Sequence, residues 1–134
     1  MATTSLLEIQ KAIRTKLLSN STLMGRVNGI FDNVPDTRSF PYITIGEALE
    51  LKFNTFGRDG KEVLHTLHIW SEYNGFKEVL EIMDIVDSEL DGVNLSVDGF
   101  DLVLIHFEDK ITMRDIDHRL AHIVARYRVI VQHN

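Results

Sequence analysis

The 134-residue chain has no cysteine, only two prolines and one tryptophan, and fewer basic than acidic residues. Without cysteine it can form no disulfide, no thiolate nucleophile and no zinc–thiolate centre. The formal net charge of −6 disfavours adhesion to nucleic acid or to an anionic membrane surface. The longest purely apolar run of the second half, residues 102–105, is far too short to span a bilayer. The first residues lack the basic segment of a signal peptide, so we expect a soluble protein without a membrane partner.

What remains is an ordinary globular composition, with 44% hydrophobic and 25% charged residues, and a length that predicts one domain over residues 1–134. Apolar residues recur with helical spacing in two segments and alternate with polar residues in the others. Strands that come in pairs around helices predict an α+β fold, a largely antiparallel sheet packed by two main helices. The predicted bounds are 5–19 and 74–91 for the helices, and 27–31, 42–53, 61–70, 100–111 and 118–132 for the strands.

Local signals mark the ends of both predicted helices. Ser5 and Glu8 have the spacing of a capping box, in which each side chain satisfies a free backbone amide at the helix start. Gly92 follows the second helix, where a left-handed residue commonly ends one. Acidic residues persist into the last turn of that helix, against the helix dipole, which favours a role for them in binding a partner. We expect the apolar stripe of this helix at Phe76, Val79, Leu80, Met83, Val86 and Leu90, opposed by Glu78, Glu81, Asp84, Asp87 and Asp91.

The six histidines do not predict a metal site. His118 and His122 lie four residues apart in a segment of period two, and along a strand that spacing separates the rings by about 13 Å. His65 and His68 fall on opposite faces of their strand. The glycine-containing segment 57–61 has neither the spacing nor the following helix of a phosphate-binding loop. We therefore expect no enzymatic activity, no metal and no cofactor.

A turn with two glycines separates the strands of the central hairpin, and we interpret it as an assembly loop. An exposed aromatic residue at such a tip, Phe56, is an unburied anchor that a partner could cover. We expect the loop to be disordered in the free protein and to order on binding. The loop comprises Asn54, Thr55, Phe56, Gly57, Arg58, Asp59 and Gly60.

Two surfaces of opposite charge are candidate contacts between copies of the chain. Arg126 and Arg128 share one face of the last predicted strand, and Glu81 and Asp84 lie on the polar side of the second helix. A ring closed by rotation needs two different patches on each subunit, and these two are complementary. The alternative is that the arginines keep a sheet edge charged and so prevent unwanted strand pairing. The sequence does not separate these two interpretations.

Both prolines lie in one segment, residues 34–47, whose sequence is VPDTRSFPYITIGE. Pro35-Asp36 predicts a turn, and Phe40-Pro41 predicts an extended approach to the β-rich run that begins at Tyr42. Placed after one short amphipathic helix, this segment resembles the tail completion proteins of long-tailed phages with non-contractile tails. The resemblance extends over the whole chain, including the strand end Trp70-Ser71-Glu72 and the paired closing strands. It brings no catalytic residues.

The resemblance implies a structural function in virion assembly. Such a protein is expected to form a hexameric ring at the head-proximal end of the tail and to join the tail to the connector of the DNA-filled capsid. The implied partners are the tail tube protein and the head connector (stopper) protein, and DNA is expected to pass through without being specifically bound. The implied location is the virion, at the head–tail interface, after assembly in the host cytoplasm. The alternative is a cytoplasmic adaptor or inhibitor without a virion role.

Overall fold

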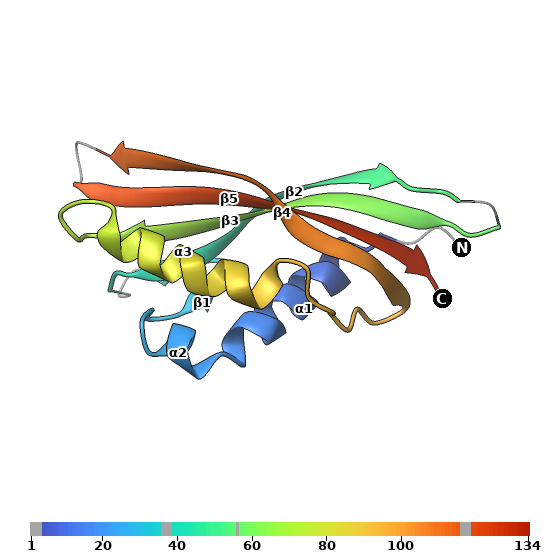
Figure 1. Cartoon of the computed structure of the whole chain (residues 1–134), viewed down its shortest axis with the longest axis horizontal. Helices are drawn as coiled ribbons and strands as arrows, with labels where there is room; N and C mark the ends of the chain where they lie inside the picture. The colour runs from blue at the N-terminus through green and yellow to red at the C-terminus, as the bar shows by residue number, and fades with distance from the viewer. Residues whose placement is uncertain (1–3, 36–38, 56, 116–118) are drawn as a thin grey trace.

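The computed structural model describes residues 4–35, 39–55, 57–115 and 119–134, which form one twisted sheet with helices beside it (Figure 1). The order across the sheet is β1-β2-β3-β5-β4. β1 pairs with β2 in parallel, and the other neighbours are antiparallel. The predicted α+β fold is therefore confirmed. The helices are α1 (Leu6–Leu18), α2 (Ser21–Met24) and α3 (Lys77–Leu90), and the strands are β1 (Ile30–Phe31), β2 (Tyr42–Lys52), β3 (Gly60–Ser71), β4 (Phe100–Asp115) and β5 (Leu120–His133).

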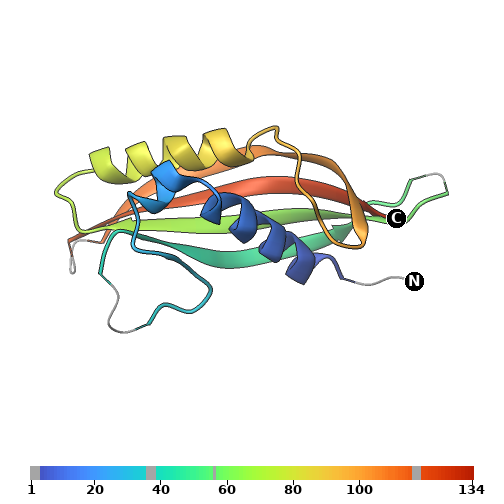
Figure 2. The same ribbon diagram turned by 90° about the horizontal axis from the view of Figure 1, so that it is seen from below.

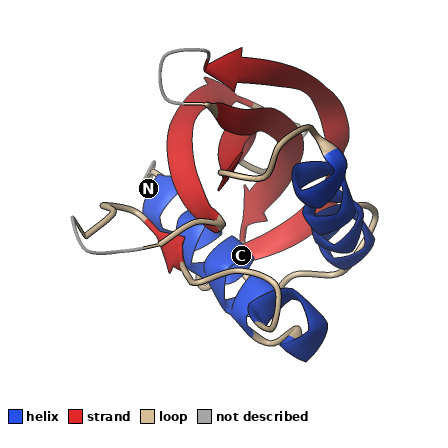
Figure 3. Ribbon diagram, turned by 90° about the vertical axis from the view of Figure 1, so that its left-hand side faces the viewer, coloured by secondary structure: helices blue, strands red, loops and turns tan. Residues whose placement is uncertain are grey.

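The helices of the described chain cover one face of the sheet and leave the other face free (Figure 2). Viewed end-on, the sheet is strongly curled (Figure 3). Alternation in the two central strands separates the faces as predicted, because successive strand side chains point in opposite directions. The helix-covered face carries the core, with the fully buried Tyr127 as its largest side chain. The buried residues of the central strands on that face are Val63, His65, Leu67, Ile69, Ala121, Ile123, Ala125, Tyr127, Val129 and Val131.

α1 is held by its apolar stripe and by a contact at its first turn that differs from the predicted one. Its buried residues Ile9, Ile13 and Leu17 recur every four positions and face the sheet. The Ser5 amide and hydroxyl donate to Glu50 Oε2 of β2 at 2.8 and 2.7 Å. The predicted capping box with Glu8 is therefore wrong, since a carboxylate from the sheet already satisfies the helix start.

α3 presents a slightly different stripe from the predicted one. Val79, Met83, Val86 and Leu90 are buried, but Leu80 remains 45% exposed and Ile82 is buried instead, so the placement of Leu80 in the stripe was wrong. Ile82 continues the helical period from Val79, whereas Leu80 is turned about 100° from it.

The acidic C-terminal end of α3 finds its partners inside the chain. Asp87 accepts a hydrogen bond from the Tyr127 hydroxyl and pairs with Lys110 of β4. Asp91 Oδ1 accepts the Phe107 amide at 2.8 Å, and Gly92 adopts the predicted left-handed conformation, with φ of 70°. Burial, together with the hydrogen bond to Asp87, raises the pKa of Tyr127. Asp87 and Asp91 thus join α3 to the sheet, in contrast to the predicted placement on the polar side.

The segment between α1 and β2 was the least predictable part of the described chain. The strand predicted over 27–31 is reduced to the two-residue β1, and a short helix, α2, precedes it. The Asn20 side chain caps α2 by accepting the Leu23 amide at 2.9 Å. The Phe40–Pro41 peptide bond is cis. Asp36, in the predicted turn, and His118 lie outside the described residues.

Candidate assembly surfaces

The tip of the β2–β3 hairpin extends beyond the rest of the sheet at one end of the molecule (Figure 1). Thr55 and Arg58 close a tight turn through two backbone hydrogen bonds of 2.9 and 3.0 Å. Arg58 also reaches sideways, donating to Asp101 Oδ2 and to the His133 carbonyl, both at 2.8 Å. The assembly loop predicted from the sequence is therefore tied to the start of β4 and to the end of β5.

Further contacts fix the base of the same tip. The Asp59 carbonyl accepts the His133 amide at 2.9 Å, and the Gln132 side chain donates to the Thr55 hydroxyl at 2.8 Å. A Cβ at Gly60 would lie 2.4 Å from the Phe53 carbonyl oxygen, so the close passage of two backbones requires glycine there. The described tip residues thus contact the ends of β4 and β5, and the expected ordering of the loop on binding stays a prediction. Phe56, the predicted anchor, lies outside the described residues.

The free face of the sheet contains a partly apolar hollow of about 340 Å³. Leu49 and Leu64, which are directly opposite each other in the register, form one side, and Val124 of β5 contributes to the other. Arg126 lines the same hollow. Leu49 is 53% exposed, because no other layer of the described chain covers this side of the sheet.

The two arginines predicted to form a basic patch lie on this free face but are paired within the chain. Arg126 Nε donates to Asp109 at 2.8 Å, and Arg128 Nε donates to Glu108 at 3.0 Å. Arg128 also pairs with Glu62 of β3. The positive charge that the sequence suggested is therefore offset by neighbouring carboxylates on β3 and β4.

The acidic pair predicted as their complement lies on the other side of the molecule. Glu81 and Asp84 are both exposed on α3, on the helix layer. Glu81 lies 2.9 Å from Arg26 in an ion pair. The structure thus places Glu81 and Asp84 on one side and Arg126 and Arg128 on the other, so they could meet only between different copies.

Comparison with known families identifies the type of protein to which this architecture belongs. The family model described as "Tail completion protein gp17" matches residues 11–132, nearly the whole chain. The chain belongs to the tail completion protein gp17 family. The resemblance inferred from residues 34–47 is confirmed, and the role of the chain is that of a phage tail completion protein in virion morphogenesis.

Two solved structures share the fold of this tail completion protein. One is a chain described as "Virion of native gene transfer agent (GTA) particle", with a TM-score of 0.90 and 18% identity, covering 98% of this chain and 99% of that one. The other is described as "Structure of bacteriophage SPP1 gp17 protein", with a TM-score of 0.63 and 24% identity, covering 93% of this chain and 88% of that one. No curated protein matches the sequence significantly.

Sequence reasoning missed a cluster of stacked aromatic side chains on the free face of this tail completion protein. His68 Nδ1 lies 2.7 Å from His122 Nε2, and His68 Nε2 lies 2.9 Å from Glu47. Trp70 stacks on His122 with ring centroids 3.7 Å apart and donates to the Thr44 hydroxyl at 3.1 Å. Burial and the neighbouring His68 lower the pKa of His122 to about 4. The signal was present, because His68 and His122 occupy same-face positions of two predicted strands, but strand order was needed to bring them together.

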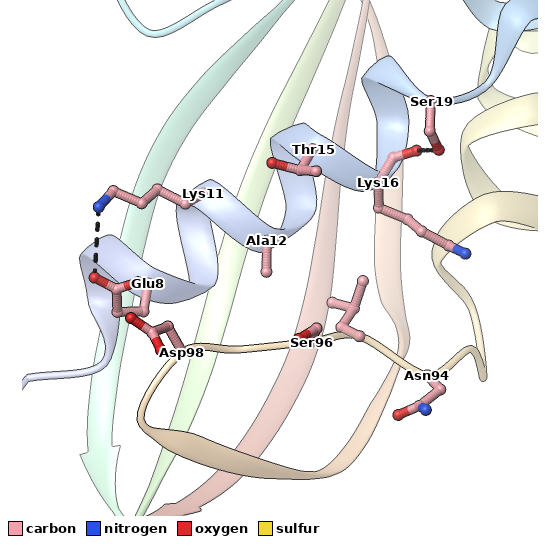
Figure 4. Close-up of a pocket in the computed structure, with 10 residues that line it drawn as sticks. Glu8, Lys11, Ala12, Thr15, Lys16, Ser19, Asn94, Ser96 and Asp98 are labelled. Carbon is pink, nitrogen blue, oxygen red and sulfur yellow. Dashed lines mark hydrogen bonds and ion pairs between the residues drawn. The ribbon is translucent and has the colours of Figure 1, made fainter.

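A second hollow, of about 510 Å³, lies between α1 and the segment 94–98 (Figure 4). Ala12 and Thr15 line it from the helix. Two lysines on α1 pair with carboxylates instead of pointing freely into it: Lys11 lies 3.5 Å from Glu8, and Lys16 lies 3.4 Å from Glu89. The hollow is thus a surface groove lined by both polar and apolar residues.

Among the described residues, no group of three or more histidine, aspartate or glutamate side chains is placed to hold a metal ion. Nor does any helix in the described ranges combine the length and apolar character needed to cross a membrane.

Proposed function

We propose that the protein forms a hexameric ring at the head-proximal end of a phage tail and joins that tail to the connector of the DNA-filled capsid. The observation that carries this proposal is the match to the tail completion family over residues 11–132. The similarity of the whole fold to a chain of a virion particle supports it. The role is structural, without catalysis or a cofactor, and the site of action is the head–tail interface of the virion.

The shape of the subunit suits a protein that connects two different partners. The strands run along the long axis of the molecule, and the β2–β3 tip lies at the opposite end from the start of α3 and the end of β4 (Figure 1). A ring with its axis along the strands would present one of these ends to the tail tube protein and the other to the head connector protein. We assign the tip, residues 54–60, to one of these contacts.

The ring also needs a contact between neighbouring copies, and a closed ring requires two different patches on each subunit. The sequence predicted Glu81 and Asp84 against Arg126 and Arg128, which would stack the helix layer of one copy on the free sheet face of the next. That contact stays a proposal, and it must compete with the intrachain partners of Arg126 and Arg128. The net acidic charge of −6 suits a conduit through which DNA passes without binding.

Electron microscopy of lysates tests the proposal directly. The gene is deleted from the phage or prophage that carries it and is supplied again from a plasmid as the control. We expect DNA-filled heads beside detached tails in the deletion, and joined particles when the gene is restored. Overlong tails would add a role in ending tail growth. Normally joined particles in the deletion would overturn the proposal and leave the cytoplasmic adaptor as the remaining interpretation.

A further inference from the structure

We propose that neighbouring copies join through their sheet edges, with residues 110–115 of β4 in one copy lying beside residues 47–52 of β2 in the next. The contact would continue the sheet from subunit to subunit. It rests on the proposed ring, but it names a contact different from the charged faces predicted from the sequence.

The first edge is the C-terminal half of β4. Among the described strands, β4 pairs only with β5, so its other side is an edge. The segment after α3 covers the middle of this edge, where Gly92 donates to the Ile105 carbonyl and Asp91 accepts the Phe107 amide, both at 2.8 Å. Beyond that cover, residues 111–114 are all exposed, with Ile111 at 58% and Met113 at 40%.

The second edge is the C-terminal half of β2. In the described chain, β1 covers β2 only at Ile43 and Thr44. Residues 47–49 and 51–52 are exposed, with Leu49 at 53% and Leu51 at 47%. Natural sheets usually protect such edges with charge, proline or a covering segment, because an open apolar edge pairs with other strands. Both edges carry charged residues, among them Glu47 and Lys52 on β2 and Lys110 and Arg114 on β4. Each edge nevertheless also leaves two apolar side chains exposed.

The two edges are complementary in face and in direction. Leu49 and Leu51 pair in register with Leu64 and Glu62, and Ile111 and Met113 pair with Val124 and His122, all on the free face of the sheet. β2 and β4 run in opposite directions, because three antiparallel steps separate them. A rotation about an axis along the strands preserves this relation, so β4 of one copy meets β2 of the next in antiparallel sense. The two edges differ, as a closed ring requires.

The register within one subunit implies that each neighbour is displaced along the strands. Ile111 lies in one row with Val124, His68 and Thr44, whereas the open part of β2 begins at residue 47. Pairing the two open stretches therefore staggers adjacent copies. Strands that close into a barrel are tilted and staggered in this way, so the offset is compatible with a closed ring.

Cysteine cross-linking tests the contact cleanly, because the natural chain contains no cysteine. The double variant Leu49→Cys with Met113→Cys carries one thiol on each edge, at positions that are exposed in the single subunit. Particles are produced by complementing the deletion and are treated with a short bifunctional thiol reagent. We expect a ladder of covalent oligomers that ends at the ring size, whereas each single variant stays monomeric. The control is Leu80→Cys with Val103→Cys, two exposed positions away from the proposed contact, which should give no ladder.

Dimers from Met113→Cys alone would show two β4 edges facing each other and would overturn the proposal. The proposal is also overturned if joined particles contain the double variant but give no ladder of covalent oligomers. The proposed joining function would still stand in that case. Joined particles without the protein would instead refute the proposed function itself.

Discussion

At the scale of single residues, His65 is the buried group with the clearest consequence in solution. It lies on the helix-covered face of β3, only 2% exposed, and its Nδ1 has no hydrogen-bond partner among the described residues. Burial lowers the pKa of His65 to about 4, because the charged imidazolium would lose its hydration there. The unfolded chain, in contrast, takes up this proton near the ordinary histidine pKa of about 6.5.

The sign of the resulting pH dependence follows from proton binding. Between the two pKa values the unfolded state binds more protons than the native state, so the free energy of unfolding falls as the pH is lowered from 6.5 toward 4. We expect His65→Leu to lose up to about 3 kcal/mol of this dependence, since each pKa unit is worth roughly 1.4 kcal/mol. Urea denaturation at several pH values measures it. The exposed His106→Leu is the matched control, and equal slopes for the two variants would contradict the prediction.

At the scale of elements, the contact between α1 and β2 depends on one carboxylate. Burial of Glu50 opposes its charge, but hydrogen bonds from Ser5 and Thr4 outweigh it and lower the pKa of this group. We expect Glu50→Ala to reduce the free energy of unfolding by about 1–3 kcal/mol, because the Ser5 amide and hydroxyl both lose a charged acceptor. The matched control is Glu8→Ala. If Glu8 formed a capping box, this change would lower the free energy of unfolding, whereas the observed contacts predict almost no effect. Urea denaturation of both variants decides between the two. A larger loss for Glu8→Ala would restore the capping box.

The same contrast shows what the sequence could predict. Strong periodicity was sufficient to predict which side chains of β3 and β5 face the core. Apolar and polar residues alternate there, so the apolar set that includes Tyr127 must lie on the buried face. The presence of helix α3 was predictable, but its buried stripe was not predicted fully. Leu80 was placed in the stripe in place of Ile82, because several apolar residues lie close to it on the helix surface. Contacts between distant segments, such as Ser5 with Glu50 or His68 with His122, depend on strand order, which no local pattern contains. β1 is too short to have a period at all.

The candidate site was predictable to a similar degree. The position of the hairpin tip followed from its glycines and was right, with Gly60 required by the close backbone approach. Its attachment through Arg58 to Asp101 was not foreseeable, because the two residues lie 43 positions apart. Arg126 and Arg128 were placed on the right face, but their partners Glu62, Glu108 and Asp109 come from the neighbouring strands. Charge on one strand could not reveal how the sheet compensates it.

At the scale of the whole molecule, two arrangements of a ring make opposite demands on the surface. Stacking the helix layer on the free sheet face requires the charges of Glu81 and Asp84, whereas joining the sheet edges does not. We expect Glu81→Lys with Asp84→Lys to enter particles as well as the natural chain does. The exposed ion pair with Arg26 that this change removes is worth only about 0.2–1 kcal/mol.

The matched variant is Ile111→Lys with Met113→Lys, which places two charges where the proposed edge contact would bury them. We expect this variant to fold, because both side chains are exposed in the single subunit, but to be lost from particles at least tenfold. Quantitative blotting of purified particles against lysate measures incorporation, and thermal unfolding of each purified subunit confirms the fold. The opposite pattern would be exclusion of the variant with Glu81→Lys and Asp84→Lys and incorporation of the edge variant. That result would contradict the edge contact and would require the helix layer of one copy to contact the free sheet face of the next.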